Sequence, residues 1–231
     1  MATQTMDAQL EALNLLLEPT RRRLYDFVER QPRAVSRDDA AEACGIGRAL
    51  AAFHLDRLVE AGLLRAEYRR LSGRSGPGAG RTSKLYRRSR HEFAVTLPHR
   101  QHELLARLLA ESANGGEGTP SGVEPAWAYG HSLGARARKR ARGRVRGDRL
   151  VKCVEDVLET LGFDPYRPSP DQIRLRNCPF DPLSRVFAPV VCGIGQAVAR
   201  GVVEGVGADG VQVSRDERPD VCCGVLSIRG R

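Results

Sequence analysis

Apolar residues recur at helical spacing along the first quarter of the chain. One stripe covers residues 10–17, and a second covers residues 24–28 after Pro19, a residue suited to the first turn of a helix. A third stripe, over residues 50–59, stops before Gly62. The pattern therefore predicts a series of short helices that ends near residue 61.

A glycine turn separates the last two of these helices. Ser36 followed by Asp39 is a capping-box pattern that opens a helix through Cys44. Gly45 can take the left-handed conformation that ends such a helix, and the next helix is expected over residues 47–61. Two helices joined in this way form a helix-turn-helix.

Two strand-like segments follow, over residues 63–70 and 83–88, with a glycine-rich stretch between them. A hairpin after a helix-turn-helix makes a winged helix, which we place at residues 8–92. In such a domain the second helix of the pair enters the major groove, and the hairpin (the wing) reaches phosphates or the minor groove.

A narrow leucine stripe marks the helix expected over residues 97–113. A narrow stripe suits a partner helix, so we interpret it as a dimerisation helix; the alternative is that it packs against its own domain. The stripe consists of Leu104, Leu105, Leu108 and Leu109. Residues 114–124 are rich in glycine and proline and are expected to be a linker.

The remaining segment, residues 125–231, predicts a C-terminal α+β domain with a sensor role. Two tandem helices are followed by a short strand at 173–178, an apolar helix at 190–206 and strands at 211–213 and 221–228. The fold class is therefore α+β: a winged helix-turn-helix, a dimerisation helix and a cysteine-containing sensor domain.

The charge balance favours a polyanionic partner. The net charge is +9, and much of the basic character lies on the expected hairpin, which points to double-stranded DNA. The candidate DNA contacts are Arg48, His54 and Arg57 on the helix and Arg69, Arg74, Arg81 and Lys84 on the hairpin. A further basic run at 136–149 is either a solvated helix face or a second DNA contact.

Several classes of protein are disfavoured by the sequence. No apolar run approaches the roughly 18 residues of a membrane span, and the first residues lack the basic start of a signal peptide. We therefore expect a cytoplasmic protein in which disulfides are rare. No nucleophile–base set, carboxylate pair or nucleotide-binding loop stands out, so an enzyme is not expected.

Four of the six cysteines lie in the last quarter of the chain: Cys178, Cys192, Cys222 and Cys223. Cys192 is expected in the first turn of its helix, where the backbone dipole favours a thiolate. Neighbouring residues of a strand point to opposite faces, so Cys222 and Cys223 are not expected to ligate one centre together. Structural zinc, a thiol–disulfide switch and an iron–sulfur cluster all remain open from spacing alone. Cys44 and Cys153 are interpreted as helix packing.

The sequence resembles two related groups of bacterial regulators. Its first half, with the segment GRTSKLYRRS, resembles the ArsR-type winged-helix repressors, and the segments GHSLGARARKRARGR, LETLGFDP, RNCPF, VCG and CCGVL resemble the SufR-like branch. The resemblance implies a homodimer that binds an operator and carries a cysteine-bound iron–sulfur cluster, expected to be 4Fe-4S. It implies as ligands Cys178, Cys192 and one of Cys222 or Cys223. The alternative is a regulator that senses a metal ion, thiol oxidation or an apolar small molecule.

Overall fold

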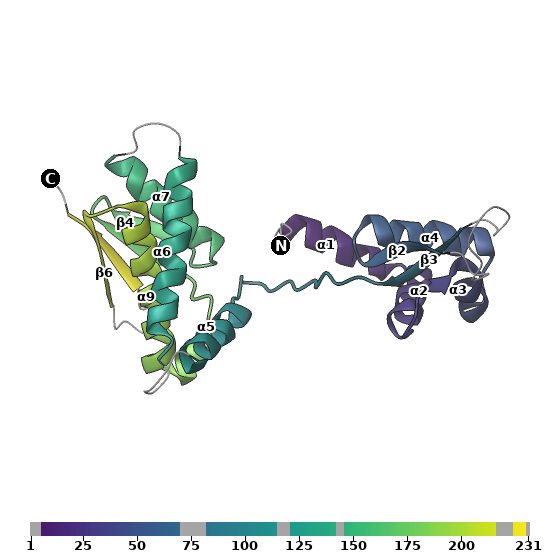
Figure 1. Ribbon diagram of the computed structural model, residues 1–231. Coiled ribbons are helices and arrows are strands. Elements are labelled where there is room, and N and C mark those ends of the chain that lie inside the picture. The colour runs from purple at the N-terminus through teal and green to yellow at the C-terminus, as the bar shows by residue number, and fades with distance from the viewer. Residues whose placement is uncertain (1–5, 70–81, 115–120, 142–145, 216–223, 230–231) are drawn as a thin grey trace. The chain divides into compact units, whose positions relative to one another are not determined.

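The computed structural model describes residues 6–69, 82–114, 121–141, 146–215 and 224–229 (Figure 1). The contacts within the chain divide it into two compact units, residues 1–95 and 96–231. The boundary lies before the helix that was expected to stand apart as a dimerisation element. That helix belongs to the second unit.

The first unit has the element order of a winged helix. Its three strands form one antiparallel sheet in the order β1-β3-β2, and residues 64–69 of β2 pair with residues 83–88 of β3. The elements are α1 (Met6–Asn14), a 3-10 turn η1 (Leu15–Leu17), α2 (Pro19–Glu29), β1 (Val35–Ser36), α3 (Arg37–Cys44), α4 (Arg48–Glu60), β2 (Leu64–Arg69) and β3 (Ser83–Arg88). The predicted helix-turn-helix and hairpin are confirmed.

Local side-chain chemistry sets the ends of these helices. The Ser36 hydroxyl accepts from the Asp39 backbone N–H at 3.2 Å, and the Asp39 carboxylate accepts from the Ser36 N–H at 2.9 Å, which completes the expected capping box. Gly45 ends α3 with φ +63°, a backbone conformation that favours glycine. Three residues therefore set the start and the end of α3.

Glu18 caps α2, and its titration should appear in the stability of the first unit. Its carboxylate accepts from the backbone N–H groups of Thr20 at 2.9 Å and Arg21 at 2.7 Å. These two bonds lower the pKa of Glu18 from 4.5 to about 2. A lowered pKa in the folded state stabilises the fold above pH 4.5, and this contribution is lost as the pH falls toward 2.

We therefore expect Glu18→Gln to destabilise the protein at pH 7 and to have little effect at pH 2. Urea unfolding of wild type and variant at several pH values between 7 and 2 measures this difference. Glu42→Gln, which changes an exposed glutamate of α3, is the control and should show no such trend. A wild-type-to-variant gap that stays constant down to pH 2 would contradict the capping role.

The second unit combines helices with a four-stranded antiparallel sheet in the order β4-β5-β7-β6. Helix α9 packs on β6 and β7, and α6 lies along α9. The elements are α5 (His102–Asn114), α6 (Val123–Arg140), α7 (Asp148–Thr160), β4 (Pro165–Ser169), β5 (Gln172–Leu175), α8 (Leu183–Val186), α9 (Ala188–Val206), β6 (Val211–Arg215) and β7 (Gly224–Ile228). The mixed helix and sheet content agrees with the predicted α+β class.

Four glycines let α6 and α9 approach to backbone contact. A Cβ on Gly130 would overlap the Val198 carbonyl, and a Cβ on Gly201 would overlap the Trp127 carbonyl. Gly134 and Gly205 stand one turn further along and meet the opposite backbone in the same way. The interface therefore admits no side chain at these positions, and its tight packing fixes how the two helices cross.

The leucine stripe of α5 is buried within its own unit. Leu104, Leu105 and Leu108 keep only 7%, 3% and 0% of their surface exposed, and they join the same core as α7 and α9. The interpretation of this stripe as a free dimerisation face is wrong for these three residues. The stripe correctly indicated that these leucines are buried. The spacing of apolar residues does not reveal whether they pack against the same chain or against a second one.

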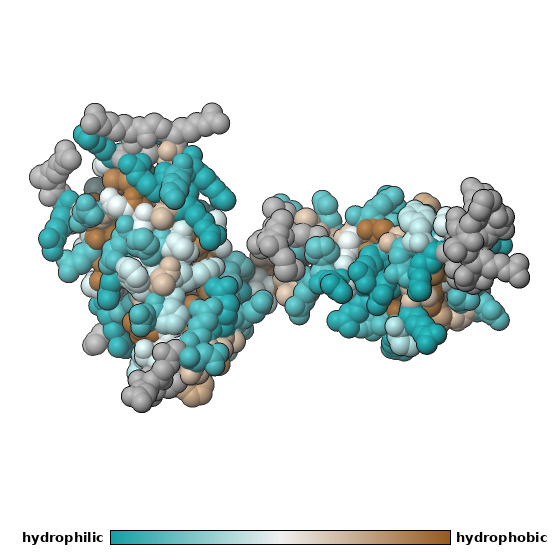
Figure 2. Space-filling view, viewed as in Figure 1, coloured by the Kyte–Doolittle hydropathy of each residue, from teal (hydrophilic) through white to brown (hydrophobic). Residues whose placement is uncertain are grey.

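Hydrophilic residues cover most of the described surface on the face drawn in Figure 2, and apolar residues appear there as small patches. Among the described residues, no helix combines the length and the apolar character needed to cross a bilayer.

Candidate functional site

Helix α4 presents one face to solvent and one to the core of the first unit. Its buried side is formed by Ala51, His54, Leu55 and Leu58. Its exposed side begins with Arg48, Ala49 and Leu50 and continues through Phe53 and Arg57. Phe53 is 60% exposed and Leu50 is 46% exposed, which is unusual for such apolar side chains on a helix that packs a core.

His54 is not on the exposed face. The residue is only 8% exposed, and its Nδ1 lies 3.9 Å from Glu18 Oε2 at the start of α2. The expectation that His54 contacts DNA is therefore wrong. It follows Phe53 by one position, and one step along a helix turns a side chain by about 100° from the solvent face toward the core.

Lys84 is engaged inside the unit. Its Nζ donates to Asp56 Oδ1 at 2.7 Å, and the Tyr86 hydroxyl donates to the same oxygen at 2.7 Å. Burial raises the pKa of Asp56, but these two hydrogen bonds outweigh burial and leave the pKa below its ordinary value. Lys84 thus ties β3 of the wing to α4, and its expected contact with DNA stays a prediction.

Three of the expected contacts remain exposed on the first unit. The side chains of Arg48, Arg57 and Arg69 are 62%, 54% and 69% exposed. Each faces an exposed or half-buried carboxylate: Asp38 at 2.5 Å, Glu60 at 3.8 Å and Glu67 at 3.6 Å, respectively. Surface pairs of this kind contribute roughly 0–1 kcal/mol, so a phosphate or a base edge can replace the carboxylate at little cost.

Arg74 and Arg81, the expected phosphate contacts of the wing tip, lie outside the described residues.

The comparison with known proteins agrees with this geometry. Residues 16–67 match a family model described as a helix-turn-helix domain, and the match spans η1 through most of β2. It supports a DNA-binding transcription regulator. No curated protein and no solved structure matches the chain.

Cys178 and Cys192 line the same small apolar cavity in the second unit. Cys178 follows β5 and Cys192 lies on α9, so the fold brings together two cysteines from different elements. The cavity is lined by Phe163, Leu175, Cys178, Val191, Cys192, Gly195, Gln196, Ala199 and Gly224. Gly224 opens β7 directly after the Cys222–Cys223 pair.

The segment that carries Cys178 is held by Arg100, a residue that precedes α5. Arg100 Nη1 donates to the Cys178 carbonyl at 2.9 Å and to Asn177 Oδ1 at 2.5 Å. Asn177 in turn donates from Nδ2 to the His99 carbonyl at 3.1 Å. These bonds fix the backbone at Cys178 and place a guanidinium group beside it.

Cys192 lies two residues further into its helix than expected. Helix α9 begins at Ala188, which makes Cys192 its fifth residue rather than a member of the first turn. The argument that the helix dipole stabilises its thiolate is therefore not supported, because that effect fades beyond the first turn. Cys222 and Cys223 lie outside the described residues, and within the described ranges no three metal-ligating side chains gather.

The two remaining cysteines have packing roles. Cys44 contacts the core of the first unit and Cys153 that of the second. Burial raises the pKa of both thiols, which favours the neutral form. Both observations agree with the predicted packing role.

Two features of the site escaped the sequence. Phe53 and Leu50 belong to the apolar pattern that predicted their helix, yet they lie on its exposed side. Arg100 is separated from Cys178 by more than seventy positions, and a single arginine carries no pattern that links it to a distant cysteine. For Phe53 a signal was present in the sequence. The apolar residues of this helix spread around too much of its circumference for all of them to face one core.

Proposed function

We propose that the protein is a transcriptional regulator that reads duplex DNA with α4 as a homodimer, and that cysteines of its second unit hold an iron–sulfur cluster which controls operator affinity. The observation that carries the first part is the exposed face of α4 within a winged helix. The second part is supported by Cys178 and Cys192, which line one cavity together with Gly224, the residue that follows Cys223 in the sequence.

Base reading would come from two kinds of side chain on α4. Arg57 can form a bidentate pair with guanine, and exposed apolar groups such as Phe53 can contact the methyl group of thymine. The Asp56 link to Lys84 and Tyr86 holds this helix against the wing, so both elements would meet DNA as one rigid surface. Two copies are needed because winged helices of this kind read paired half-sites.

We expect Arg57→Ala and Phe53→Ala to reduce sequence preference more than total affinity. A lost bidentate pair costs roughly 1–3 kcal/mol of discrimination, whereas phosphate contacts act on every sequence alike. The measurement is a salt titration of affinity for a duplex selected from a random library and for its scrambled version. Replacing the thymines by uracil should weaken wild type but not Phe53→Ala.

Arg30→Ala, which changes an exposed residue at the C-terminal end of α2, is the matched control and should bind both duplexes like wild type. Equal losses on selected and scrambled duplexes for both α4 variants would contradict the reading role of this helix. In that case the basic run at 136–149 becomes the candidate DNA surface.

The cysteine cavity suits a thiolate-ligated cluster in its donor chemistry. Cys178 and Cys192, with either Cys222 or Cys223, would be the ligands, and clusters accept cysteines from widely spaced segments. When bound, a cluster of the 4Fe-4S kind would make the protein sensitive to iron supply and to oxidants, because both determine whether the cluster is present and intact. Arg100, which also pairs with the Asp181 carboxylate at 3.5 Å, would hold the backbone at Cys178 in place, and the apolar lining would limit the access of water.

The cluster is tested by purification without air, followed by an absorption spectrum and by iron and acid-labile sulfide analysis. We expect a brown protein with iron and sulfide in comparable amounts. Colourless protein containing zinc, or no metal, after cluster reconstitution would contradict this part of the proposal and leave the DNA-reading part untouched.

A further inference from the structure

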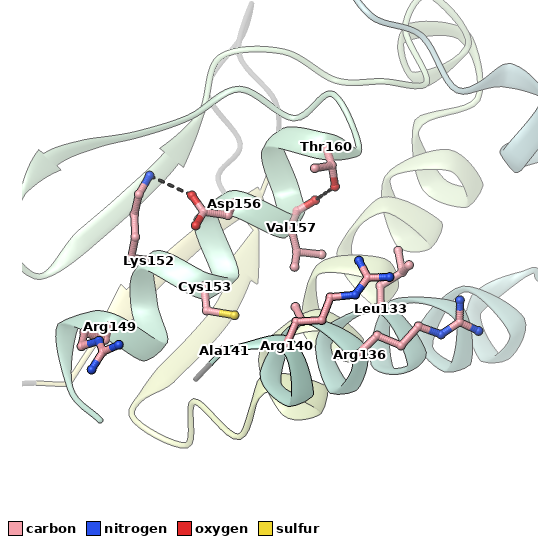
Figure 3. Close-up of a pocket in the computed structure, with 11 residues that line it drawn as sticks. Leu133, Arg136, Arg140, Ala141, Arg149, Lys152, Cys153, Asp156, Val157 and Thr160 are labelled. Atoms are coloured by element: carbon pink, nitrogen blue, oxygen red, sulfur yellow. Dashed lines mark hydrogen bonds and ion pairs between the residues drawn. The ribbon is translucent and has the colours of Figure 1, made fainter. Parts of the chain in front are cut away.

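A second and larger pocket opens between the end of α6 and α7 (Figure 3). Its volume of about 570 Å³ falls within the roughly 300–1,000 Å³ typical of small-molecule sites. It shares no lining residue with the cysteine cavity. The pocket is lined by Leu133, Arg136, Ala137, Arg140, Ala141, Arg149, Lys152, Cys153, Asp156, Val157 and Thr160.

The inner wall of this pocket is apolar. Leu133 and Ala137 come from α6, and Val157 and Cys153 come from α7; all four contact the core of the unit. Burial favours the neutral form of the Cys153 thiol, so it behaves as a small apolar group here. Figure 3 shows the Cys153 sulfur pointing toward α6. A ligand seated on this wall would remove apolar surface from water.

The rim carries an excess of positive charge. Arg136 and Arg140 extend from α6, and Arg149 stands at the start of α7 (Figure 3). None of the three has an ion-pair partner within the part of the chain that the structure describes. The fourth cation, Lys152, is paired at 2.9 Å with Asp156, the acidic residue of the pocket lining, so these two charges compensate each other. Three guanidinium groups are thus available to an anion.

We propose that this pocket binds a small amphipathic organic anion, with its apolar body on the Leu133–Val157 wall and its carboxylate or similar head group on Arg136, Arg140 and Arg149. An apolar wall below a cationic rim complements this class of ligand in both parts. Duplex DNA fits less well, because phosphates would meet the rim but leave the apolar wall without a partner. The site does not depend on the cluster or on operator binding.

Titration calorimetry of the full-length protein with decanoate below its micelle concentration tests the site. We expect saturable binding of decanoate, with decanol and decyltrimethylammonium at least tenfold weaker. The double variant Arg140→Ala/Arg149→Ala should lose at least tenfold in decanoate affinity. Lys139→Ala, an exposed cation of the same helix that does not line the pocket, should bind decanoate like wild type.

A second measurement uses the wild-type protein and avoids any question of folding. Decanoate should slow alkylation of Cys153 several-fold, read by mass spectrometry of its peptide, and leave the rate at half-buried Cys44 of the first unit unchanged. The proposal is overturned if decanoate protects neither cysteine or both equally, or if the cationic detergent binds as well. It is also overturned if the double variant loses affinity for duplex DNA but keeps its affinity for decanoate, because the rim would then be a DNA-binding surface.

Discussion

Gly201→Val should unfold the second unit and leave the first one folded. A side chain at position 201 would overlap the Trp127 carbonyl and the backbone nitrogen of His131, and neither can move without displacing α6. Overpacking of this kind usually costs about 1–3 kcal/mol, and more where rigid backbone is the obstacle. We expect a loss of at least about 3 kcal/mol, measured by urea unfolding.

Limited proteolysis locates the damage, because residues 96–231 should become sensitive while residues 1–95 resist. The matched control is Gly193→Ala on the same helix, where the added Cβ would have Val123 Cγ2 at 3.8 Å as its neighbour. That variant should be as stable as wild type or up to about 1 kcal/mol more stable, since alanine favours a helix. Equal behaviour of the two variants would show that α6 and α9 are not in backbone contact.

Cys178→Ser and Cys192→Ser should each lose most of the iron and acid-labile sulfide of protein purified without air. A serine hydroxyl is a poor substitute for a thiolate on iron, and the two cysteines share one cavity. Elemental analysis and the visible absorption spectrum measure the loss. Comparing Cys222→Ser with Cys223→Ser then identifies the third ligand, and we expect Cys222 to be the sensitive one.

Cys44→Ser and Cys153→Ser are the controls and should retain the cluster, because both residues contribute to packing away from the cysteine cavity. Full cluster content in both the Cys178 and the Cys192 variants would show that neither cysteine ligates the cluster. Loss in all four variants would point to instability of the protein rather than to ligation.

The elements of the first unit could be predicted from the sequence because local chemistry determines them. Ser36 with Asp39 caps α3, Gly45 ends it, and Pro19 opens α2. The roles of single side chains were harder to predict. Lys84 was expected to contact DNA, but its Nζ donates to Asp56, which lies on α4 far back along the chain. Charge in a sequence does not reveal whether a neighbour in space already neutralises it.

The second unit illustrates a different limit. The leucines of α5 indicated burial, yet the identity of their partner depends on the whole fold. The two glycines of the segment GHSLG do not by themselves predict contact with α9. That contact also requires Gly201 and Gly205 on the facing helix. The approach of Cys178 to Cys192 depends on how a strand end is set against a helix, which spacing along the chain does not encode.

We propose above that the state of the cysteine site controls DNA affinity. The most direct test compares cluster-loaded and cluster-free protein on the selected duplex, by fluorescence anisotropy without air and at one fixed salt concentration. We expect affinities that differ at least tenfold between the two states, and we expect Cys192→Ser protein to bind like the cluster-free form under both preparations. Equal affinity of loaded and cluster-free wild-type protein would contradict control of DNA affinity by the cluster, even if the protein proves to carry one.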